Sequence, residues 1–379
     1  MTRYRALLAL ALVESYATIL VERAIFFYTG TVLGYSDQFN LFMALSLGVF
    51  YIIGAKCSHV LAARLGEKRV LWLTIIGQLV VHLFMWQRPT VLVLITGNVL
   101  IGLLNGLKWP VVESYVGAGR KPKEASRALG QFNMAWSLGV PLSLVTAGPI
   151  IAYSGSGLFL AAAIANAVAC FLLIPFEARP VHLPVDHPDK PDPVLARRYG
   201  YLLSASRWSM LSAYSLLFLL SPLIPGVFTR LGVPLIYATG LAGLLDLTRW
   251  MTFAVMARYT GWHGKGWVAA VPLLGLPLGF YLTLYGSSLL MVISGEVLFG
   301  VTAGIAYYAA LYYVMILLNA AVEAGGEHEG LIGLGFCLGP AVGLLGGWTG
   351  YLALTCVPLI LVCLGLSLRS MIRLRQVGH

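Results

Sequence analysis

Apolar runs of about 20 residues recur along the whole chain, and each could cross the roughly 30 Å hydrocarbon core of a bilayer as a helix. About twelve such runs fit into the sequence. The composition agrees, because 59% of residues are hydrophobic, 11% are charged and the mean hydropathy is +0.84, which leaves too little polar surface for a soluble fold. We therefore predict an all-α integral membrane protein with twelve transmembrane helices. Residues 6–33 begin like a signal peptide, but their apolar run continues to about Gly34, so we expect them to be retained as the first helix.

One segment of the sequence occurs twice, at residues 97–116 and, 198 positions later, at residues 295–314. The residues that recur unchanged in the second copy are Gly97, Val99, Leu100, Gly102, Gly106, Tyr115 and Val116. Both copies keep a Gly-x-x-x-Gly spacing, which allows another helix backbone to approach closely. The repeat predicts two pseudo-twofold-related six-helix bundles, residues 1–176 and 199–379, joined by a polar, Pro-rich linker at 177–198. Such duplicated membrane halves are typical of secondary transporters.

Lysine and arginine residues gather on one side of the predicted helices. If the N-terminus is inside, 18 of them fall in the loops and tails of that side, and two, Arg88 and Arg230, fall on the other. The positive-inside rule then predicts a multi-pass protein of the cell (inner) membrane with both termini and the linker in the cytoplasm. This placement also accounts for the net charge of +10. Because no basic stripe with interleaved aromatic residues is present, we expect no nucleic-acid partner.

The segment His59-Val60-Leu61-Ala62-Ala63-Arg64-Leu65-Gly66-Glu67-Lys68-Arg69 resembles the signature loop of the major facilitator superfamily, Gly-x-Leu-Ala-Asp-Arg-x-Gly-Arg-Arg. Arg64, Gly66 and the basic end match the family pattern, whereas His59 replaces its glycine and Ala63 its aspartate. The resemblance extends over the whole chain. It implies the twelve-helix fold of that family, transport of a small solute by alternating access, and a central cavity lined by helices 1, 4, 7 and 10. The missing aspartate removes a carboxylate that in relatives helps to close the cytoplasmic side.

Ionisable residues lie inside the predicted spans, five acidic and five basic. They are Glu14, Glu22, Arg23, Lys56, Lys108, Glu113, Arg207, Asp246, Arg249 and Glu296. A charge in hydrocarbon costs several kcal/mol, so such residues face the bundle interior or a wet cavity and usually pair. Mutual neutralisation without any role in transport is the alternative for each of them.

The candidates for binding substrate or a proton lie closer to the middle of the membrane. They are Glu22, Arg23, Asn105, Lys108, Glu296, Tyr307 and Tyr308. Glu296 is our first choice for exchanging a proton, because its repeat counterpart, Asn98, cannot titrate. Arg23 and Lys108 are the predicted anchors for an anionic substrate group, so the expected solute is an organic anion or a zwitterion.

A second group of charged residues is predicted to form gating or structural ion pairs. Its members are Glu14, Arg64, Glu113, Arg207, Asp246 and Arg249. Asp246 and Arg249 are three residues apart on one helix face, which favours a local ion pair. Glu113 lies near the basic loops, and Glu14 and Arg207 could connect the two halves.

The leading functional hypothesis is a proton-coupled secondary transporter that acts as a monomer in the bilayer, without catalytic residues, cofactor or metal. The sequence contains no ATP-binding loop, and its five cysteines lack metal-ligand spacing. Two alternatives stay open. One is a transport-inactive receptor or scaffold. The other is a lipid-modifying membrane enzyme, for which Glu327-His328-Glu329 is the one tempting triplet, although it lacks the second histidine of a zinc site.

Overall fold

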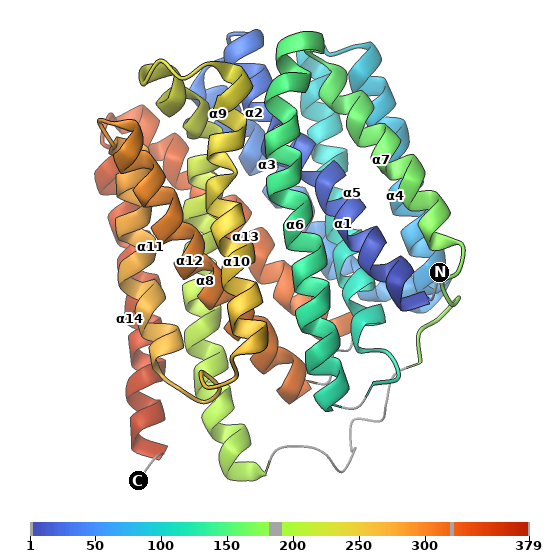
Figure 1. The fold of residues 1–379 in the computed structure, drawn as a ribbon, viewed down its shortest axis with the longest axis vertical. Helices are drawn as coiled ribbons and strands as arrows, with labels where there is room; N and C mark the ends of the chain where they lie inside the picture. Colours follow the sequence, from blue (N-terminus) through green and yellow to red (C-terminus); the bar gives the residue numbers. More distant parts are fainter. Residues whose placement is uncertain (1–2, 121, 182–191, 319–321, 378–379) are drawn as a thin grey trace.

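The computed structural model describes residues 3–120, 122–181, 192–318 and 322–377, which form a bundle of long helices with no strand among them (Figure 1). The helices are α1 (Arg3–Glu22), α2 (Ile25–Phe27), the π-helix η1 (Tyr28–Val32), α3 (Asp37–Leu65), α4 (Glu67–Gln87), α5 (Val91–Gly117), α6 (Pro122–Ser154), α7 (Gly157–Leu173), α8 (Pro193–Arg230), α9 (Leu235–Ala242), α10 (Leu244–Arg258), α11 (Trp267–Tyr285), α12 (Leu289–Leu318), α13 (Val322–Thr349) and α14 (Leu352–Val377). We refer to α1–α7 as the N-half and to α8–α14 as the C-half.

The prediction of twelve spans is confirmed. Ten helical stretches of the described chain are long and apolar enough to cross a membrane, and one of them joins α1, α2 and η1 as Arg3–Val32. The eleventh span is α7, a shorter apolar helix, and the twelfth consists of α9 and α10, which are separated by Gly243 alone. Helix α8 begins at Pro193, within the stretch predicted as linker, because the Asp192 side chain accepts hydrogen bonds from the amides of Val194 and Leu195 and caps the helix.

The duplicated glycines lie at a close contact between two helices in both halves. A Cβ atom at Gly106 of α5 would lie 2.1 Å from the carbonyl oxygen of Tyr51 on α3. Its counterpart in the second half, Gly304 of α12, is also confined, since a Cβ there would lie 2.8 Å from the Thr252 side chain on α10. One turn earlier, a Cβ at Gly300 would lie 2.1 Å from the carbonyl oxygen of Leu245. The repeat therefore records a matched helix contact in which two helices approach closely.

The two halves meet along two seams, where α3 packs on α13 and α6 packs on α9 and α10. The contact is close at Gly48, whose Cβ would lie 2.6 Å from the Phe336 backbone, and at Gly148, whose Cβ would lie 2.5 Å from the Thr239 hydroxyl. We call the side on which α3 ends, α8 begins and α14 ends the linker side; it lies at the bottom of Figure 1. Towards this side the seams widen into two clefts of about 840 and 900 Å³, bordered by α3, α8 and α13 and by α6, α10 and α12.

Candidate functional site

A cavity with charged and aromatic lining residues lies between the halves at the centre of the bundle, and both halves contribute to its wall. We call it the central cavity. Its volume is about 80 Å³, enough for about five water molecules. Aromatic side chains line much of it, among them Trp136 from α6, Tyr214 from α8 and Tyr307 from α12. Its charged lining residues are Glu22, Arg23, Glu113, Arg249 and Glu329.

Glu22 and Arg23 reach the cavity where the first span departs from α-helical geometry. Helix α1 ends at Glu22, and the amide of Ala24 bonds to the carbonyl of Ile19, five residues back. A single π-type turn of this kind re-aims side chains and is frequent at functional sites. The break therefore presents two successive charged side chains to the space between the halves.

The carboxyl groups of Glu113 on α5 and Glu329 on α13 lie beside each other in the cavity wall, within reach of a hydrogen bond. We call these two residues the acid pair. The Tyr51 hydroxyl donates a further hydrogen bond to Glu329 Oε2. A carboxylate has no donor, so two carboxyl groups can bond in this way only when one carries a proton. The acid pair thus places two carboxyl groups from different halves where one proton can bridge them.

A group of opposite sign borders the same cavity. Arg23 of the N-half forms an ion pair with Asp246 of α10, and its Nε donates to the Ser221 hydroxyl of α8 at 3.2 Å. The expected pair of Asp246 and Arg249 also forms, at 2.8 Å between Oδ1 and a terminal guanidinium nitrogen. Asp246 thus holds one guanidinium from each half, and the Arg23 contact joins the halves. The Nε of Arg249 is buried and lacks a hydrogen-bond partner in the part of the chain that the structure describes, while its guanidinium lies 5.4 Å from the Trp136 ring.

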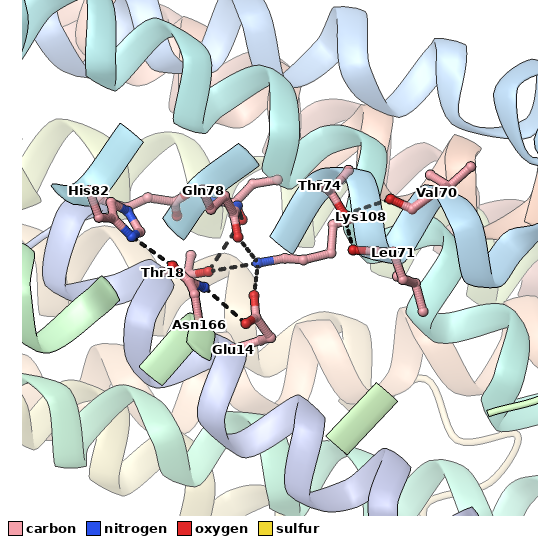
Figure 2. Close-up of polar contacts among 11 residues, drawn as sticks. Glu14, Thr18, Val70, Leu71, Thr74, Gln78, His82, Lys108 and Asn166 are labelled. Atoms are coloured by element: carbon pink, nitrogen blue, oxygen red, sulfur yellow. Dashed lines mark hydrogen bonds and ion pairs between the residues drawn. The ribbon is translucent and has the colours of Figure 1, made fainter. Parts of the chain in front are cut away.

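Lys108 was predicted to anchor substrate in the cavity, but it does not line the cavity and faces into the N-half instead. Its ammonium group lies 2.6 Å from Glu14 Oε2, 2.9 Å from Gln78 Oε1 and 3.3 Å from the Thr18 hydroxyl. Figure 2 shows these side chains converging from α1, α4 and α5. The placement follows from Glu14, which supplies a carboxylate inside the same half.

The same polar group continues in two directions. Glu14 Oε1 accepts a hydrogen bond of 2.9 Å from Asn166, which contacts His82 at 2.7 Å (Figure 2). On the other side, Gln78 donates to Asn105 at 2.5 Å, and Asn105 donates to Glu22 Oε1 at 2.7 Å. We call the residues Glu14, Thr18, Gln78, Asn105, Lys108 and Asn166 the N-half network. Asn105 therefore touches the central cavity through Glu22 and through Thr18, a cavity-lining residue whose hydroxyl donates to Asn105 Oδ1 at 3.3 Å.

The remaining binding candidates are dispersed. Glu296 is buried on α12 outside the cavity lining, and its carboxyl oxygens have no hydrogen-bond partner among the described residues. Tyr307 lines the central cavity, where its ring stacks on Phe253 with 5.5 Å between centroids. Tyr308, one residue on, borders the 900 Å³ cleft.

The other gating candidates also differ from their predicted contacts. Arg207 pairs with Glu327 at 3.4 Å within the C-half, and Glu14 pairs within the N-half, so neither forms the expected connection between halves. Arg64 lies in the last turn of α3, in a groove on the linker side that it shares with Arg179. Glu113 was predicted to lie near the basic loops. Its carboxyl group instead lines the central cavity, beside that of Glu329.

Sequence reasoning missed Glu329 as a site residue. Glu327, His328 and Glu329 have three different environments: Glu327 is exposed beside Arg207, His328 is buried against Tyr307, and Glu329 lines the central cavity. No three metal-binding side chains cluster within the described ranges. The available signal was spacing, since Glu329, Ile332 and Phe336 fall on one helix face at i, i+3 and i+7, and all three line the cavity.

The whole chain is similar to known membrane transporters. The family model described as Major Facilitator Superfamily matches residues 6–344. The structure resembles that of a point mutant of the nucleoside transporter NupG, with a TM-score of 0.63, 13% identity and full coverage of both chains. It also resembles a bacterial homologue of the human lysosomal transporter Spinster, solved inward-facing and unoccupied, with a TM-score of 0.62, 16% identity and coverage of 99% of this chain and 95% of that one. At these identities the two structures show a shared fold. No curated protein sequence matches the chain.

Proposed function

Because the chain belongs to the major facilitator superfamily and is a membrane transporter rather than an enzyme, we propose that it moves a small organic anion or zwitterion by alternating access, coupled to protons. The observation that carries this proposal is the central cavity, which both halves line and which holds carboxyl and guanidinium groups away from lipid. Buried charges of this kind in a membrane protein are expensive and mark substrate or ion pathways.

The two seams support a rocking motion of the halves. They are tight where Gly148 meets Thr239 and open into clefts at the linker side. Motion of one half against the other about a fixed central site would exchange the open and closed ends. With the linker side in the cytoplasm, as the 18 to 2 distribution of Lys and Arg favours, this arrangement faces inward. We propose a monomer in the inner membrane, since one chain supplies both halves of the cavity.

Arg249 is the proposed contact for the anionic group of the solute. Its Nε is a buried donor in the cavity wall without a partner in the described chain, and a ligand carboxylate or phosphate would satisfy it. The acid pair, with Glu22 and Glu296 as further candidates, provides carboxyl groups for the proton.

The test is a thermal-shift screen of the purified protein against organic acids and zwitterions, followed by uptake into proteoliposomes that contain a pH dye. A ligand should stabilise the protein and drive a pH change inside the vesicles. Arg249→Gln should weaken its affinity at least tenfold, or about 1.4 kcal/mol. The matched control is Arg207→Gln, an arginine of the same half that lies outside the central cavity. Binding without any flux would favour the receptor alternative, and equal effects of both substitutions would contradict this site.

A further inference from the structure

We propose that the acid pair is an exchange site, at which the ammonium group of a zwitterionic solute replaces the proton that Glu113 and Glu329 share. The inference rests on the proposed function and narrows its solute from anion or zwitterion to zwitterion. It also sets the direction of coupling, because the solute and the proton then occupy the same place in turn and must move in opposite directions.

The first argument is the position of the acid pair. One carboxyl group belongs to each half, both line the central cavity, and the two lie within reach of a hydrogen bond. If the shared proton leaves, two carboxylates stand in contact inside a bundle where charges are poorly screened. They then need another cation between them. The Tyr51 hydroxyl bonds to Glu329 alone and brings no positive charge.

The charge balance of the exchange is simple. The pair with its proton carries one negative charge, and loss of that proton to water raises this to two. An ammonium group returns the total to one negative charge. One O–H bond breaks, N–H···O hydrogen bonds form in its place, and no atom is oxidised or reduced.

The second argument is independent of the acids and concerns Arg249. Its side chain is buried in the wall of the same cavity, and its Nε–H lacks a partner in the described ranges although Asp246 holds the terminal nitrogen. A buried guanidinium donor without a partner is costly, and an anionic ligand group removes that cost. The cavity therefore offers a cation to one end of a ligand and the acid pair to the other. The aromatic walls, including Tyr214 and Tyr307, enclose about 80 Å³, which suits a short carbon chain between the two charged ends.

Ionisable groups face the acid pair from every neighbouring element. They are Glu22 on α1, Tyr51 on α3, Tyr214 on α8 and Tyr307 on α12, while Arg249 on α10 lines the same cavity and His328 on α13 packs against Tyr307. Glu22 is the one other carboxylate of the cavity wall among the described residues, and it already accepts a hydrogen bond from Asn105 of its own half. The acid pair is thus the place where loss of a proton changes the attraction between the halves.

This has a consequence for the transport cycle. With a proton or an ammonium group between the carboxyl groups, the halves attract at this point, whereas the empty pair repels. Closure of the cavity around an empty pair is therefore disfavoured, and the return step carries a proton. The result is exchange of one zwitterion for one proton rather than their co-transport.

The experiment measures protons released when a ligand binds to the purified, full-length protein in weakly buffered lipid nanodiscs. The probes are small enough for the cavity and form matched trios with one carbon skeleton each: 4-aminobutyrate, butyrate and butylamine, and 3-aminopropionate, propionate and propylamine. A zwitterion should bind more tightly than its anion and release about one proton, while the anion releases none. The affinity of the zwitterion should then rise about tenfold for each pH unit over which the pair is protonated.

The variants are Glu329→Gln and Glu113→Gln, each checked for an unchanged melting temperature. Both should abolish proton release. The matched control is Glu327→Gln, which removes an exposed carboxylate two residues from Glu329 and should keep the release. The wild-type comparison stands even if a variant fails to fold.

The outcomes separate this proposal from the proposed function. Absence of binding by both zwitterions, or equal affinity and proton release for anion and zwitterion, overturns the exchange site. Proton-coupled flux that persists in that case leaves the proposed function intact. Proton release without flux in proteoliposomes supports the exchange site and contradicts transport.

Discussion

The N-half network and the central cavity contain the same kinds of residues, but their polar side chains differ in whether they have hydrogen-bond or ion-pair partners. In the network, Lys108 has three partners, and Glu14, Gln78 and Asn105 are bonded from both sides by residues of the same half. In the cavity, the two carboxyl groups of the acid pair lie beside each other without a cation between them among the described residues, and the Nε of Arg249 lacks a partner there. A network within one half moves with that half as a rigid body. Under the proposed rocking motion the contacts between halves must change, so the groups without partners lie where that motion would occur.

The largest effect should come from breaking the network. Lys108→Met leaves the Glu14 carboxylate buried without its counter-charge, and loss of one partner of a buried ion pair costs about 3–5 kcal/mol. We expect a large fall in the free energy of unfolding, measured by chemical denaturation in mild detergent. The double variant Lys108→Met with Glu14→Gln should recover part of that loss because no charge is left unpaired.

The control for this comparison is Lys56→Met, which removes a solvent-exposed lysine at the border of a cleft and should change stability little. A stable Lys108→Met protein that has lost ligand binding would place Lys108 in the transport site and remove the distinction between the two regions.

A smaller effect should follow when a bond between the halves is broken. Arg23→Gln removes the ion pair from the N-half to Asp246, but Asp246 keeps Arg249 as partner. We expect a loss of about 2 kcal/mol, the usual worth of a hydrogen bond to a charged group. The loss should be local, with faster amide hydrogen exchange in α2 and η1, where the chain follows Arg23.

Lys108→Met supplies the contrast for the hydrogen-exchange measurement, since its effect should spread through α1, α4 and α5 together. If Arg23→Gln accelerates exchange in those same three helices and not in residues 25–32, the ion pair holds the N-half together rather than joining it to the C-half.

Much of the fold could be predicted from the sequence, but little could be predicted of which charged side chains form ion pairs. Apolar run length fixes twelve spans, and the repeated glycines indicate that α5 and α12 each have a close helix neighbour, although only the structure shows that these neighbours are α3 and α10. The pairing of charges depends on helix rotation, which a uniformly apolar helix does not encode. Lys108 is one turn from Asn105 on α5, yet only the position of α1 decides that Glu14 meets it. Glu329 was considered only within the triplet Glu327-His328-Glu329 at the start of an apolar run, whereas α13 already starts at Val322 and carries Glu329 into the bundle.

The smallest effect on stability should come from Glu296→Gln, which separates two hypotheses for the proton. Glu296 is buried with both carboxyl oxygens unpartnered in the described ranges, so an amide of the same shape should change the free energy of unfolding by less than about 1 kcal/mol. If the acid pair carries the proton, Glu296→Gln keeps ligand-driven pH changes in proteoliposomes and Glu113→Gln abolishes them. The reverse result would assign coupling to a carboxyl group within the C-half. Such a group lies within one half, so its protonation would not directly change the contacts between the halves. Unpartnered groups at the contact between the halves would then no longer identify the site of proton coupling.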